Sequence, residues 1–86
     1  MDPEFKAWLK NMASKWPRET KDCFLDLAKH NPEQARNVIA QNLEGWGHAY
    51  VIKVNKPVVC QNPNSEAQEV FEMFKELYAE ELGAMK

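Results

Sequence analysis

The sequence predicts a small α+β domain that is mostly helical, with three short N-terminal helices, one β-hairpin and one long C-terminal helix. Three observations lead to this prediction. Four of the five prolines stand where a helix would begin, apolar residues recur at helical spacing, and one stretch in the second half of the chain loses that spacing. Because 86 residues leave room for one hydrophobic core, we expect a single domain.

The prolines mark the starts of the four expected helices. Proline suits the first turn of a helix because its φ is already helical and its missing N–H would be unpaired there. Apolar residues at helical spacing then give each segment a face that can be buried. We therefore expect helices over residues 3–15, 17–30, 32–44 and 63–82, with Gly45 ending the third helix.

Residues 48–61 are expected to form the β-hairpin. β-Branched residues dominate this stretch, and the residues that alternate onto one face are Tyr50, Ile52 and Val54. The turn is expected at Asn55 and Lys56. Because a lone hairpin is marginally stable in water, it would pack on the helices or pair with a second chain.

Composition and motifs argue against several classes of function. The net charge is −2, and we find no apolar run of the length expected for a signal peptide or a membrane span. We therefore expect a cytoplasmic protein with reduced thiols and no membrane contact. The serines, threonine, cysteines and histidines form no local pattern typical of a nucleophile or a metal site, and the three glycines form no phosphate-binding loop. We predict that the protein is not an enzyme and has no catalytic residues, cofactor or metal.

The first functional hypothesis is a non-enzymatic protein-interaction module. Small size and the lack of a catalytic set suit a regulatory or accessory protein of bacterial or phage type, acting as a homodimer through the hairpin edge and the last helix. That helix carries a long apolar stripe, and the stretch Gly45-Trp46-Gly47 would mount an exposed tryptophan. The expected partner-binding residues are Trp46, Phe71, Phe74 and Tyr78. The alternative for the same side chains is that they pack in the core of one monomer.

The second hypothesis is a winged-helix-like DNA-binding regulator. Two helices joined by a short turn and followed by a hairpin resemble that arrangement, with the third helix reading bases and the hairpin contacting phosphates. The expected nucleic-acid contacts are Gln34, Arg36, Asn37 and Gln41 on the helix and Lys53 and Lys56 on the wing. A dedicated nucleic-acid binder is usually clearly basic, whereas this chain is not, so the hypothesis ranks second.

Overall fold

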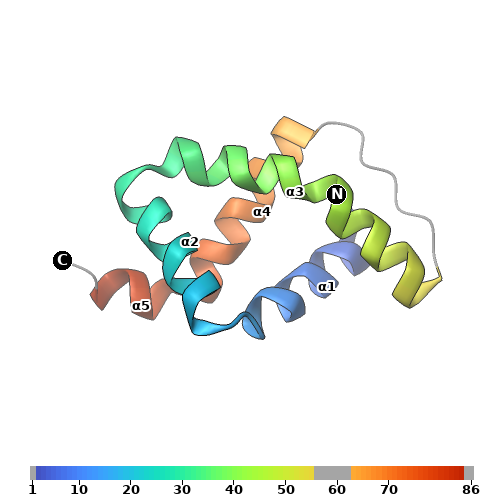
Figure 1. The fold of residues 1–86 in the computed structure, drawn as a ribbon, viewed down its shortest axis with the longest axis horizontal. Coiled ribbons are helices and arrows are strands. Elements are labelled where there is room, and N and C mark those ends of the chain that lie inside the picture. The colour runs from blue at the N-terminus through green and yellow to red at the C-terminus, as the bar shows by residue number, and fades with distance from the viewer. Residues whose placement is uncertain (1, 56–62, 85–86) are drawn as a thin grey trace.

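The fold consists of helices. The computed structural model describes residues 2–55 and 63–84, and these residues contain no strand. The elements are α1 (Pro3–Ser14), α2 (Arg18–His30), α3 (Pro32–Val54), α4 (Pro63–Leu77) and α5 (Ala79–Ala84), arranged as a single small domain (Figure 1). The mostly helical, single-domain part of the prediction is confirmed, and the α+β class is wrong.

The predicted β-hairpin is replaced by a helix over the part of it that the structure describes. Residues 48–54 are the last two turns or so of α3, which continues past Gly45 instead of ending there. Leu43, Gly47 and Tyr50 are all buried on α3, at the spacing of neighbouring helical turns. Burial of Tyr50 therefore outweighs the weak β-preference of the residues around it. The remainder of the predicted hairpin, residues 56–61, lies outside the described residues.

Local capping explains where α1 and α3 begin. The Asp2 carboxylate accepts a hydrogen bond from the Glu4 backbone N–H at 2.8 Å, and the Asn31 side chain accepts one from the Gln34 N–H at 3.3 Å. In both helices a proline follows the capping residue. Asn31 is the single residue between α2 and α3, so the chain turns a sharp corner there.

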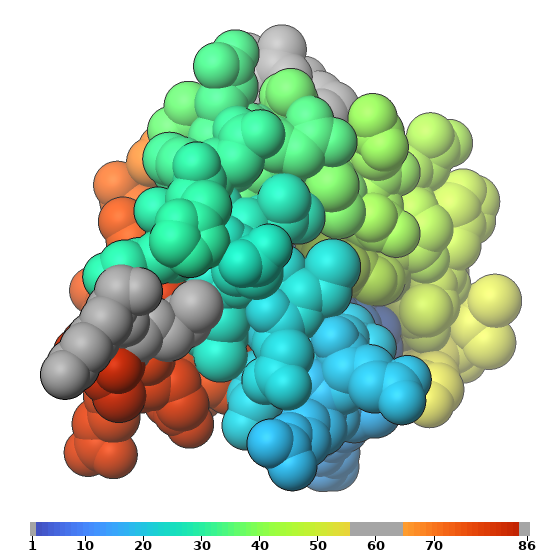
Figure 2. Space-filling view, turned by 60° about the vertical axis from the view of Figure 1, so that its left-hand side comes forward, coloured from blue at the N-terminus to red at the C-terminus, as the bar shows by residue number. Residues whose placement is uncertain are grey.

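The core lies where α1, α2 and α3 meet α4. Phe74 of α4 is fully buried, and its ring contacts the rings of Trp16, Phe24 and Trp46 at centroid distances of 5.0, 5.7 and 6.1 Å. The Tyr78 hydroxyl, just after α4, donates a hydrogen bond to the Ala13 carbonyl at the end of α1. On the face seen in Figure 2, α2 (cyan) lies between α3 (green) and α5 (red).

The longest helix, α3, changes direction along its length. In Figure 1 its N-terminal half runs across the top of the molecule, and its C-terminal half slopes down beside α1. The second half contains Gly45 and Gly47, and closely spaced glycines are a common cause of helix bending because they leave the backbone less constrained. The bend carries the last turn of α3 to the edge of the molecule.

Candidate functional site

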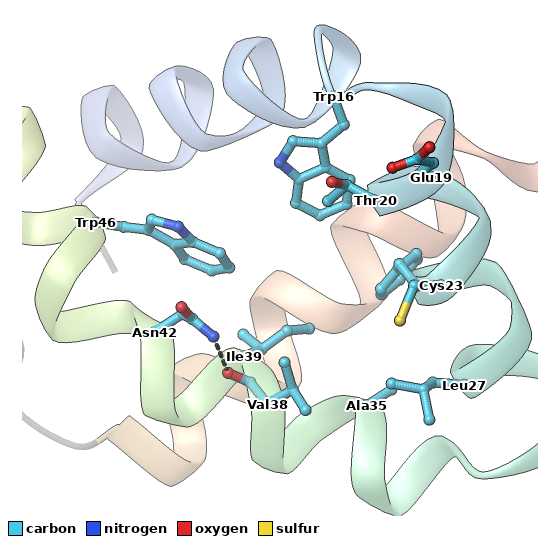
Figure 3. Close-up of a pocket in the computed structure, with 11 residues that line it drawn as sticks. Trp16, Glu19, Thr20, Cys23, Leu27, Ala35, Val38, Ile39, Asn42 and Trp46 are labelled. Carbon is cyan, nitrogen blue, oxygen red and sulfur yellow. Dashed lines mark hydrogen bonds between the residues drawn. The ribbon is translucent and has the colours of Figure 1, made fainter.

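An open groove lies between α2 and α3. The two helices diverge from the corner at Asn31, so the groove is narrow near Leu27 and Ala35 and wide toward Trp16 and Trp46 (Figure 3). Its volume is about 490 Å³. The apolar lining residues are Trp16, Phe24, Leu27, Ala35, Val38, Ile39 and Trp46, and the polar ones are Glu19, Thr20, Cys23 and Asn42. The groove therefore presents a mainly apolar surface to solvent.

Two tryptophans form the wide end of the groove. Trp16 lies in the link between α1 and α2, and Trp46 lies on α3; both are half-buried. Each indole meets the Phe74 ring edge-on, with interplanar angles of 75° and 68°. The Phe24 ring also contacts Trp16, at a centroid distance of 5.9 Å. Because the two indoles rest on one buried ring, the wide end is supported by the core itself.

Among the described residues that line the groove, Glu19 carries the only charge. It is exposed in the first turn of α2 and has neither an ion pair nor a side-chain hydrogen bond within the part of the chain that the structure describes. Other carboxylates of α2 lie near basic groups of the same helix: Asp22 is 3.6 Å from Arg18, and Asp26 is 3.8 Å from His30, which carries a charge only when protonated. Glu19 is therefore available to a cation brought from outside the chain.

The other polar lining groups offer little chemistry. The Asn42 amide donates to the Val38 carbonyl of its own helix at 2.8 Å, as the dashed line in Figure 3 shows. The Cys23 thiol is free and exposed. Over residues 2–55 and 63–84, no three His, Cys, Asp or Glu side chains gather closely enough to hold a metal ion. What the groove offers is an apolar surface with one carboxylate at its wide end.

The four predicted partner-binding residues separate into two groups. Trp46 lines the groove and is partly accessible. Phe71, Phe74 and Tyr78 lie in the core, with exposed fractions of 2, 0 and 7%. Their role in binding a partner stays a prediction, since in this structure they pack against α1, α2 and α3.

The predicted nucleic-acid contacts on α3 stay a prediction. Gln34, Asn37 and Gln41 are exposed and recur at helical spacing along α3, and Arg36 and Asn37 border a hollow of about 200 Å³ beside the start of α4. Lys53 lies in the last turn of α3, and Lys56 is outside the described residues. The wing that this hypothesis needed is absent from the described part of the chain, so the predicted winged-helix arrangement is wrong there.

Most of the groove was not predicted from the sequence. Trp46 is among the predicted partner-binding residues, whereas Trp16 and Val38, which also line the groove, are not. The signal was helical spacing: Ala35, Val38, Asn42 and Trp46 follow one side of a helix that continues past Gly45. Because the predicted helix ended at Gly45, Trp46 was not placed on the same side of it as Ala35, Val38 and Asn42.

Comparisons with known proteins add no assignment. No protein family, curated protein or solved structure matches the chain. Within the described residues, no helix is both long enough and apolar enough to cross a bilayer.

Proposed function

We propose that the protein is a non-enzymatic regulatory or accessory module that binds an apolar helical segment of a partner protein in the groove between α2 and α3. One observation carries this proposal. The chain buries a core of large side chains, yet partly buried apolar side chains at the edge of that core, Trp16, Leu27, Val38 and Trp46, line a concave surface that opens to solvent (Figure 3). Concave apolar surfaces of this kind are typical of binding sites.

The shape of the groove suits a short helix. Two helices that diverge from a corner leave space for a third, whose side chains would pack between theirs at interaxial distances of about 8–10 Å. Along α3, the groove runs from Ala35 to Trp46, which is about 16 Å at the usual helical rise. This length matches roughly three helical turns. Trp16 and Trp46 would be the main anchors, because large aromatic side chains dominate the energy of many interfaces.

The proposal also includes a homodimeric state and a cytoplasmic location, both predicted from the sequence. The hairpin edge no longer supports the homodimer, so any self-association must use another surface. Light scattering that detects only monomer at every attainable concentration would remove the homodimer from the proposal. Binding of a partner in the groove does not depend on it.

A selected-peptide experiment tests the groove. A displayed library of amphipathic three-turn helices is selected on the wild-type protein, and the enriched peptides are then measured against two variants. Val38→Glu places a carboxylate in the groove, whereas Gln41→Glu makes the same change in charge on an exposed part of the same helix. We expect binding to weaken about tenfold or more in V38E, since an unpaired charge would be buried, and to stay unchanged in Q41E.

Two results would contradict the proposal. One is that no peptide is enriched; the other is that the enriched peptides bind V38E as tightly as the wild type. Far-UV circular dichroism of both variants confirms that the helices are retained. A result in which a small apolar molecule binds while no peptide does would reassign the groove to a ligand pocket.

A further inference from the structure

The last turn of α3 is the most exposed apolar element of the described chain. Ile52 is 81% exposed, and its neighbours Val51 and Val54 are 38 and 37% exposed. We call residues 51–54 the α3 tip. In Figure 1 this tip lies at the edge of the molecule, away from α2 and α5. Single exposed apolar residues are common on protein surfaces, but an isoleucine this exposed, with partly exposed valines beside it in the same turn, favours a partner.

The α3 tip and the groove are complementary in chemistry and in charge. The tip is apolar except for Lys53, which has no ion pair within the described residues. The groove is mainly apolar and carries one carboxylate, that of Glu19, which also lacks an ion pair there. We infer that the α3 tip of one copy binds in the groove of a second copy, with Ile52 between the two helices and Lys53 beside Glu19. This inference rests on the proposed function, since it names the occupant of the same groove.

The contact has to be made between two chains. One wall of the groove and the tip belong to the same helix, so the tip cannot fold back into its own groove. Trp46 at the wide end and Ile52 at the tip are about 9 Å apart along that helix. If two copies exchange tips about a two-fold axis, the result is a closed dimer instead of an open fibre.

The first test measures self-association by sedimentation over a range of concentrations. Ile52→Glu damages the tip and Val38→Glu damages the groove, while Gln41→Glu is the control with the same change in charge. We expect the wild type and Q41E to dimerise alike. Each of the other two variants should dimerise about tenfold or more weakly, because each contact loses the burial of an apolar side chain.

The second test mixes the two damaged variants. I52E keeps an intact groove and V38E keeps an intact tip, so the mixture restores one of the two contacts. We expect a one-to-one complex between differently tagged I52E and V38E at concentrations where each alone is monomeric. A variant that had merely lost its fold would not be rescued in this way.

A charge exchange tests the pairing of Lys53 with Glu19. Lys53→Glu and Glu19→Lys should each weaken dimerisation by about two- to fivefold, in line with an exposed ion pair. The double variant restores the pair and should dimerise like the wild type. Dimerisation that is equally weak in the double variant would overturn this pairing.

Outcomes for this inference and for the proposed function are separable. A wild type that stays monomeric, or a mixture of I52E and V38E that forms no complex, overturns the exchange of tips. If selected peptides still bind the groove in that case, the groove binds a different protein and the proposed function stands. If they do not, both fail.

Discussion

At the residue scale, Tyr78 joins parts of the fold that lie far apart in the sequence. Its hydroxyl donates to the Ala13 carbonyl at the end of α1, and its ring contacts Trp16 and Phe24 at centroid distances of 6.4 Å. Burial raises the pKa of Tyr78 above its ordinary value, and the nearby Glu81 carboxylate raises it further. The neutral phenol is therefore the form that the folded protein favours.

Replacement of Tyr78 by phenylalanine should cost about 1 kcal/mol of stability, because one buried hydrogen bond is lost while the ring packing stays. A larger loss is not expected, since the Ala13 carbonyl still accepts from the Trp16 backbone N–H at 3.2 Å. Urea denaturation at neutral pH measures the change. A variant as stable as the wild type would show that this hydrogen bond adds nothing to the fold.

The raised pKa also predicts a loss of stability in alkali. Above a pH of about 10, the unfolded chain releases the Tyr78 proton more readily than the folded chain. The stabilisation is complete below that pH and falls as pH rises through the folded-state pKa. Unfolding measured from neutral pH to above pH 10 should therefore show a steeper loss for the wild type than for Tyr78→Phe. If stability falls equally with pH in the two proteins, ionisation of Tyr78 is not the cause of the loss.

At the element scale, the helix starts could be predicted from the sequence, whereas the end of α3 could not. Asp2 and Asn31 cap the helices that follow them through hydrogen bonds made within three residues, so the signal is local. Gly45 is also a local signal, for the end of a helix. Whether a helix continues past a glycine depends on what its next turns bury, and here Tyr50 is 2% exposed against α1 aromatics that are distant in sequence.

Gly45 gives a direct test of this interpretation. It is exposed in the interior of α3, and an added Cβ would meet nothing within 4 Å. Gly45→Ala should therefore stabilise the protein by about 0.5–1 kcal/mol, since glycine loses more backbone entropy on entering a helix. Thermal unfolding measures the gain. Gln41→Ala on the same helix serves as the control with a change near zero, because both residues favour helices. A loss of stability in G45A would mean that this position needs a backbone geometry that only glycine provides.

At the scale of the whole molecule, the groove depends on how three segments are arranged in space. Trp16, Glu19 and Trp46 come from the link before α2, from α2 and from α3. Sequence patterns indicate which face of each helix is apolar, but not the angle at which two helices diverge. Trp46 could therefore be named as a binding residue while the surface around it could not.

The same arrangement predicts cooperative unfolding. Phe74 links residues of α2, of α3 and of the segment before α2 in one aromatic cluster, and the buried side chains of α1 to α4 belong to one hydrophobic core. Small single-domain proteins of this kind usually unfold in one step. Far-UV circular dichroism and tryptophan fluorescence should give the same midpoint in urea. Fluorescence that changes at lower urea than the helical signal would show that the groove opens before the core.

The corner at Asn31 has a consequence for how such a protein can diversify. One residue joins the two walls of the groove, and the Phe74 ring also holds them, through Phe24 on one wall and Trp46 on the other. Lengthening the joint by a residue alters how the walls diverge only as far as these two ring contacts allow. A change of ligand preference in this architecture therefore needs the joint and the aromatic cluster to change together.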